Sequence, residues 1–184
     1  MIEAPYFRQE QEDTCGPATA RMALALHGVH FQRESAIAEE MGVCSVCGTT
    51  RRSMQRALSI LPSHEIPSAS FAELRECLDA GHVVVVDAPH PYDGIGHYYL
   101  VLGANGSLVC HDSWDGPYMS FQEHDFRRRW EGYHHNASYR GWMVAVKRPQ
   151  DDLSSHMIVS SSAGQTKFHV DASTGLALPH EKIF

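Results

Sequence analysis

The sequence lacks long apolar runs and an excess of positive charge. No segment approaches the roughly 20 consecutive apolar residues of a membrane span, and the first residues show no cationic start followed by an apolar stretch, which a signal peptide would have. The formal net charge of the 184 residues is −7, whereas nucleic acids and anionic membranes bind basic surfaces. We therefore expect neither nucleic acid nor a membrane as a partner.

The number of cysteines is odd, and no internal repeat is visible. The five cysteines cannot all pair with one another, and without an export signal they are interpreted as reduced thiols in a cytoplasmic protein. Hydrophobic residues make up 43% of the chain, which is typical of a globular protein. At this length the chain forms one ordinary domain with a sizeable core.

The first half of the chain shows helical periodicity. The pattern predicts helices over residues 17–27, 34–40, 50–61 and 70–80. Pro17 suits a first helical turn and Gly28 suits the position just beyond a helix end. Ser70 and Glu73 have the spacing of a capping box.

The second half changes to strand signals. Apolar and β-branched runs predict strands over residues 83–86, 97–102, 107–111 and 141–146, and Asn105-Gly106 is a strong hairpin signal. Helices followed by an antiparallel sheet define an α+β fold. Residues 1–149 form this domain, and residues 150–184 form a polar linker with an extension that is either a hairpin, over 167–170 and 175–178, or a flexible tail.

Cys15 lies where a polar loop turns into the first helix. The first turn of a helix has unpaired N–H groups and the positive end of the helix dipole, so a thiolate is stabilised there. Cys15 is therefore the first candidate for a nucleophile, which needs a base and an orienting group.

The predicted hairpin brings one histidine and one aspartate together. With a two-residue or a four-residue turn, His97 and Asp112 share a face of the sheet, within reach of an imidazole–carboxylate hydrogen bond. A three-residue turn would place them on opposite faces. Where the two residues share a face, Asp112 would orient His97, and His97 would act as the base for Cys15. Gln9 and Gln11 both lie upstream of Cys15 with an amide that could stabilise an oxyanion, and spacing does not separate them.

Together these residues resemble the C39 and C39-like group of papain-fold cysteine peptidases. The resemblance covers about residues 4–147 and rests on four sequence elements. These are Gln9 six residues before Cys15, the block at residues 13–18, the strand at residues 96–103, and His111-Asp112-Ser113 followed by Gly116. It implies a papain-like fold with N-terminal helices packed on an antiparallel sheet. It also implies Cys15 as nucleophile, His97 as base, Asp112 as orienting acid and Gln9, rather than Gln11, as oxyanion donor.

No cofactor or metal is expected from the sequence. Cys44 and Cys47 form a CxxC pair, but a structural zinc site needs a second tight pair of ligands, and the other cysteines are isolated. The pair His134-His135 is interpreted as part of a loop.

Three functions remain open. The first is a cysteine peptidase that cleaves a peptide or peptide-tagged protein through a thioester. The second uses the same triad for acyl transfer or deamidation, and the third is a catalytically silent module that binds peptides. A binding module has no need of Gln9, Cys15, His97 and Asp112 together, so the set favours an enzyme.

Overall fold

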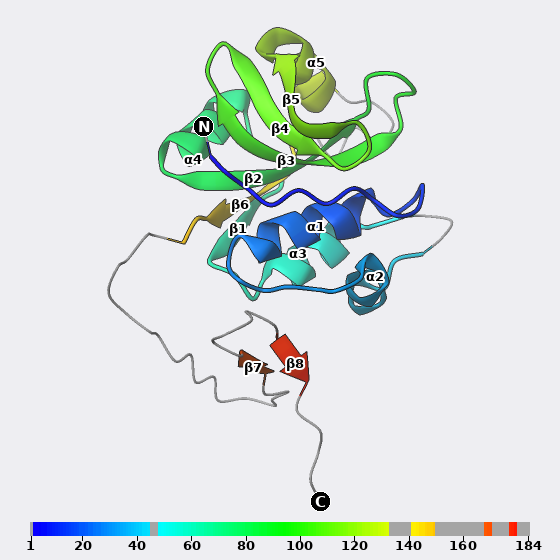
Figure 1. The fold of residues 1–184 in the computed structure, drawn as a ribbon. Helices are drawn as coiled ribbons and strands as arrows, with labels where there is room; N and C mark the ends of the chain where they lie inside the picture. The colour runs from blue at the N-terminus through cyan, green and yellow to red at the C-terminus, as the bar shows by residue number, and fades with distance from the viewer. Residues whose placement is uncertain (1, 45–47, 133–140, 150–167, 171–176, 180–184) are drawn as a thin grey trace, which may run out of the picture.

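The computed structural model describes residues 2–44, 48–132, 141–149, 168–170 and 177–179. Within these ranges the chain forms a six-stranded antiparallel sheet and five helices (Figure 1). The strands are β1 (Ser63–Ile66), β2 (His82–Pro89), β3 (Gly96–Ala104), β4 (Ser107–Asp112), β5 (Gly116–Gln122) and β6 (Met143–Lys147), in the spatial order β1-β6-β2-β3-β4-β5. The helices are α1 (Cys15–Ala25), α2 (Glu34–Met41), α3 (Arg51–Leu58), α4 (Phe71–Asp79) and α5 (Glu123–Gly132).

Helices cover both faces of the sheet. Helices α1, α2 and α3 lie on one face, and α4 and α5 lie on the other (Figure 1). In β2, Val83 and Val85 pack in the cluster with α1, whereas Val84 and Val86 pack in the cluster with α4 and α5. A strand that is buried on both faces has an uninterrupted apolar run instead of an alternating one. The four valines therefore identify the centre of the sheet.

The predicted α+β architecture is confirmed, with small shifts at the element ends. The first helix begins at Cys15, two residues before the predicted start, because Ala18 N–H already bonds to Thr14 O at 3.1 Å. Ser70 and Glu73 form the predicted capping box at the start of α4. Three elements were not predicted: the short edge strand β1, the half-exposed edge strand β5, and α5, whose residues are mostly polar.

The turn between β3 and β4 differs from both turns that the sequence favoured. Ala104 pairs with Leu108, so the connection has three residues, and only Gly106 in it adopts a positive φ. Taken alone, this turn would separate His97 and Asp112. However, β3 has one extra residue, Leu102, between the pairs Val101–Cys110 and Gly103–Val109.

This bulge returns the strands to the register that a two-residue turn would give. Tyr99 lies opposite Asp112, so His97 lies diagonally from Asp112 on the same face. An extra residue in one strand reverses which side chains face each side of the sheet, and the three-residue turn does the same. The two changes cancel at the far end of the hairpin.

Two short strands lie in the extension. Strands β7 (Phe168–Val170) and β8 (Ala177–Pro179) pair antiparallel. The rest of the extension lies outside the described residues. Within the described part of the chain, no helix is long and apolar enough to cross a bilayer.

Candidate active site

Three of the four predicted site residues line one cavity. Gln9 comes from the N-terminal segment, Cys15 begins α1 and His97 lies near the start of β3. They surround a cavity of about 320 Å³, which is also lined by His90 and Trp114. The fourth residue, Asp112, ends β4 behind His97 and is fully buried. A second cavity, of about 900 Å³, reaches Cys15 along a different wall.

The side chains of His97 and Asp112 are hydrogen bonded. Nε2 of His97 lies 2.9 Å from Oδ1 of Asp112. The same oxygen accepts the backbone N–H groups of Trp114 at 2.8 Å and Asp115 at 3.1 Å. Burial by itself raises the pKa of Asp112, but the bonds and charge of His97 together with these N–H groups outweigh it and lower the pKa. Asp112 is therefore held as a carboxylate with a fixed orientation.

The imidazole of His97 is held between Asp112 and Cys15. Burial lowers its pKa, but hydrogen bonds to Asp112 and Cys15 and the charges of both partners outweigh this and raise the pKa to about 9. Since Nε2 bonds to Asp112, Nδ1 is the ring nitrogen that remains for Cys15. At neutral pH the site thus favours an imidazolium beside the thiol.

Close packing fixes the backbone at Cys15. A Cβ at Gly16 would lie 2.2 Å from Oγ1 and 2.4 Å from Cβ of Thr49, so glycine is required for this approach. The hydroxyl of Tyr98, a residue of β3, donates to Thr49 O at 3.2 Å. This bond ties Thr49 to the sheet. Cys15 is the first residue of α1, where backbone N–H groups have no intrahelical partner. The thiol therefore lies on a rigid element beside free donors.

Gln9 is tied to both the β4 end and the loop before Cys15. Its backbone N–H donates to Ser113 O at 3.0 Å, and the Ser113 hydroxyl donates to Oε1 of Gln9 at 2.8 Å. Its Nε2 donates to Gln11 O at 2.7 Å and to Glu12 O at 3.2 Å. Gln9 is buried, whereas Gln11 is exposed and borders the second cavity. The structure thus separates two residues that sequence spacing left equivalent.

A buried carboxyl group supports the same loop. Glu34 is 1% exposed and its Oε1 accepts the backbone N–H of Glu10 at 2.9 Å. Burial raises the pKa of Glu34, although its bonds to Thr14 and Glu10 act in the opposite direction. Thr14 also exchanges hydrogen bonds with the backbone of Gln11, at 3.0 and 3.1 Å. These contacts fix the chain between Gln9 and Cys15.

His111 fastens the N-terminal segment to the sheet. Its Nδ1 accepts the N–H of Tyr118 at 3.1 Å, so Nε2 carries the proton and donates to Ala4 O at 3.0 Å. Burial lowers the pKa of His111, in keeping with this neutral form. Tyr6 adds a hydrogen bond from its hydroxyl to Asp112 O at 3.1 Å. The segment that carries Gln9 is thus attached to the strand that carries Asp112.

Of the other cysteines, the three that the structure describes do not line this cavity. Cys44 is exposed, while Cys47, His134 and His135 lie outside the described residues. Burial raises the pKa of both Cys77 and Cys110, which makes them poor nucleophiles at neutral pH. These two thiols are therefore structural.

Sequence reasoning missed three residues that border the site. His90 follows β2, Ser113 bonds to Gln9, and Trp114 lines the cavity with 43% of its surface exposed. The sequence has thirteen histidines, and nothing in the composition distinguishes His90 from the others. Its one local signal was the His90-Pro91 sequence directly after a buried strand, where loops carry functional residues.

Solved structures of C39 peptidase domains have a similar fold. The peptidase domain of Streptococcus ComA, a bifunctional ABC transporter involved in quorum sensing, matches with a TM-score of 0.60 and 18% identity, over 77% of this chain and 97% of that domain. A double-glycine-motif protease from an AMS/PCAT transporter, solved with its leader peptide, matches with a TM-score of 0.57 and 15% identity, over 80% and 93%. A C39-like peptidase from Bacillus anthracis matches with a TM-score of 0.56 and 15% identity, over 80% and 99%.

These likenesses confirm the papain-like α+β fold that the sequence predicted. No curated protein matches the chain. The model of one sequence family matches residues 1–138, which is most of the chain and includes Gln9, Cys15, His97 and Asp112. On this match, the chain belongs to the Peptidase_C39 like family.

Proposed function

We propose that the chain is a cysteine peptidase that cleaves a peptide bond through Cys15, His97 and Asp112. The observation that carries the proposal is the continuous contact from the thiol through the imidazole to a buried carboxylate, at the wall of an open cavity. Family membership supports peptidase chemistry. Cavities that reach Cys15 along two walls would allow a peptide to extend on both sides of the scissile bond.

In the first step, the Cys15 thiolate attacks the carbonyl carbon and forms a C–S bond, while the carbonyl oxygen becomes an oxyanion. The oxyanion would lie near the N–H groups that begin α1 and near the amide of Gln9, whose Nε2 would exchange its bond to Gln11 O or Glu12 O for a bond to the oxyanion. When the oxyanion collapses, the C–N bond breaks and the His97 imidazolium gives its proton to the leaving amine. A thioester on Cys15 remains.

In the second step, His97 takes a proton from a water molecule, whose oxygen attacks the thioester carbon. The C–S bond breaks, a carboxylic acid leaves, and the thiolate and imidazolium are restored. Asp112 stabilises the imidazolium in both steps. The same thioester could instead be released by an amine, which is why acyl transfer is tested beside hydrolysis.

A peptide is the substrate class that we propose. One solved relative of similar fold holds a leader peptide, and this supports peptide binding in the same fold. The choice between cleavage, acyl transfer and silent binding requires product analysis.

The deciding experiment incubates the wild type with a diverse peptide library and identifies products by mass. Cleavage that is lost in Cys15→Ala but kept in Cys44→Ala, which removes an exposed thiol, supports the peptidase. Amide exchange, deamidation or the absence of any turnover by the wild type would each contradict it.

A further inference from the structure

Behind the triad lies a second group of potential ligands. His90, Asp112 and Asp115 each offer one possible ligand atom, and these atoms lie within 4.8 Å of one another. Nε2 of His90 is 3.4 Å from Oδ2 of Asp115 and 3.9 Å from Oδ2 of Asp112. No other such group occurs in the part of the chain that the structure describes.

Two of the three side chains are deeply buried with polar atoms unused. The side chain of His90 is 10% exposed, and neither ring nitrogen has a hydrogen-bond partner. Asp112 is fully buried, and its Oδ2 has no hydrogen-bond partner although Oδ1 accepts three. Buried polar atoms without hydrogen bonds are costly, so two such groups that face each other at 3.9 Å point to a ligand between them.

We propose that His90, Asp112 and Asp115 bind a divalent transition-metal ion of the zinc class, which inhibits the proposed peptidase. One imidazole and two carboxylates are ligands that Zn²⁺ accepts at about 2.0 to 2.2 Å. A tetrahedral ion at such bond lengths has ligand atoms roughly 3.4 Å apart. The two separations from His90 are 3.4 and 3.9 Å, and all three ligand atoms lie within 4.8 Å of one another, so the side chains would move closer together around an ion. Three protein ligands leave the fourth position to water.

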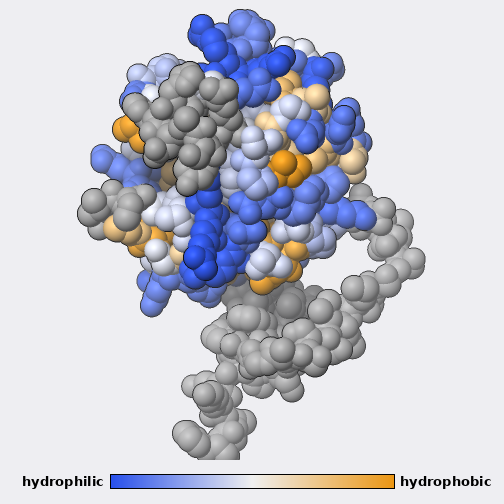
Figure 2. All heavy atoms as spheres, turned by 180° about the vertical axis from the view of Figure 1, so that it is seen from behind, coloured by the Kyte–Doolittle hydropathy of each residue, from blue (hydrophilic) through white to orange (hydrophobic). Residues whose placement is uncertain are grey.

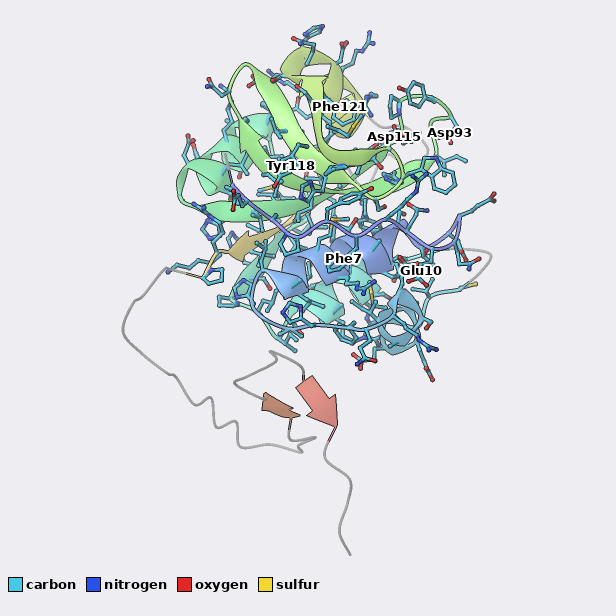
Figure 3. The ribbon with its side chains drawn as sticks, in the orientation of Figure 1. Phe7, Glu10, Asp93, Asp115, Tyr118 and Phe121 are labelled. Atoms are coloured by element: carbon cyan, nitrogen blue, oxygen red, sulfur yellow. The ribbon has the colours of Figure 1, made fainter. Side chains whose placement is uncertain are left out.

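The surroundings orient the ligands in the way that metal sites require. Nδ1 of His90 faces Oδ1 of Asp93 at 3.7 Å, and a small approach would give the carboxylate–histidine hydrogen bond found behind many zinc ligands. Asp93 and Asp115 come from separate loops that meet at one end of the sheet (Figure 3). Three donors hold Oδ1 of Asp112, and this leaves Oδ2 as its free ligand atom.

The position of the ion explains why it would inhibit. Asp112 would then share its charge between the ion at Oδ2 and His97 at Oδ1. The carboxylate that stabilises the His97 imidazolium in the proposed mechanism would be partly neutralised. The ring of His90 also lies 5.3 Å from the ring of His97, so the ion would be close to the catalytic base. This inhibitory effect rests on the proposed function, whereas the binding site itself does not.

The binding test uses the full chain carrying Cys15→Ala, which removes the thiol as a competing zinc ligand. We expect Zn²⁺ titration by calorimetry to show one ion per chain, and Co²⁺ to give the visible absorption of a tetrahedral site. His90→Gln and the isosteric Asp115→Asn should each lower the affinity by at least about tenfold, because a ligand is lost. His124→Gln, which removes an exposed histidine near Asp125, should not change it.

Each outcome of this test decides the site. Absence of binding, or binding that survives both His90→Gln and Asp115→Asn, would overturn it, and thermal unfolding confirms that the variants are folded. For inhibition, Zn²⁺ should reduce wild-type turnover, a chelator should restore it, and Asp115→Asn should need at least about tenfold more Zn²⁺. Equal sensitivity of wild type and Asp115→Asn would overturn the inhibitory role. If the wild type has no peptidase activity, calorimetry on the Cys15→Ala chain still decides the site.

Discussion

His97 and Asp112 form a 2.9 Å hydrogen bond although neither is the direct cross-strand partner of the other. Tyr99 lies opposite Asp112, and His97 reaches the carboxylate along the diagonal of the hairpin. Diagonal neighbours are further apart than direct partners, so a long polar side chain is needed to close the distance. The backbone N–H groups of Trp114 and Asp115 also hold the Asp112 carboxylate, through the same oxygen that bonds to His97.

Replacement of Asp112 by asparagine should reduce kcat/KM by about 100-fold or more, because the imidazolium loses its stabilising charge while the side-chain shape is kept. Initial rates on a cleaved library peptide measure this. The matched control is Asp125→Asn, at an exposed position on α5, which should keep wild-type rates. Equal activity of Asp112→Asn and the control would remove Asp112 from the mechanism.

Cys15 should be alkylated faster near pH 6 than the other thiols. The imidazolium of His97 lies beside it, whereas burial raises the pKa of Cys77 and Cys110. Iodoacetamide labelling followed by peptide mass analysis gives the rate at each cysteine. His97→Gln should slow Cys15 selectively. Uniform rates over all five cysteines would count against an activated thiolate.

Stability should depend on pH through His97. Its folded pKa of about 9 lies above the ordinary histidine pKa of 6.5, so the contribution of its proton is fully present below pH 6.5 and is lost as the pH rises through 9. Urea unfolding of wild type and His97→Gln should therefore differ most at low pH. The difference should shrink by up to about 3 kcal/mol toward pH 10. The exposed His124 provides the control, His124→Gln. A difference that stays constant with pH would contradict the raised pKa.

Gln9 and Gln11 should differ strongly in their effect on catalysis. We expect Gln9→Ala to lower kcat by about 10² to 10³, the effect of losing an oxyanion donor, and Gln11→Ala to leave it within about twofold. Because Gln9 also holds the loop through Gln11 O and Glu12 O, thermal unfolding must show that Gln9→Ala is folded. Similar losses in both variants would argue that the loop, and not the amide of Gln9, is required.

Gly16→Ala should damage the site by steric overlap. The added Cβ would lie 2.2 to 2.6 Å from three side-chain atoms of Thr49, so Thr49 or Cys15 must move. Overpacking of this kind costs about 1 to 3 kcal/mol of unfolding free energy. Gly103→Ala is the control, since nothing lies within 4 Å of its added Cβ. Adding Thr49→Gly should partly restore Gly16→Ala, and failure to do so would argue against this contact.

The hydrophilic character of the surface fits the negative charge of the sequence. The face seen in Figure 2 is mostly hydrophilic, with hydrophobic residues in small separate spots. Large exposed apolar patches mark interaction surfaces more often than scattered residues do. Within the described residues, this face therefore gives no sign of an extended apolar docking surface.

The sequence alone predicted most of the element types and the family, and it nominated the candidate site residues. The valine run of β2, the capping box of α4 and the loop-to-helix position of Cys15 are local patterns, and local patterns follow from helix and strand geometry. Helix α5 escaped prediction because its residues are mostly polar, and edge strand β5 because it begins with Gly-Pro and has no buried residue.

Only the tertiary structure decided how these pieces meet. The face of the sheet on which a side chain lies depends on the number of residues between it and the turn. The Leu102 bulge, which no local pattern reveals, therefore decides whether His97 and Asp112 share a face. Burial and hydrogen bonds to Ser113 separate Gln9 from Gln11, which spacing could not do. The same is true of His90 and Asp115, which are distant in sequence and come together at Asp112 because two loops meet at one end of the sheet.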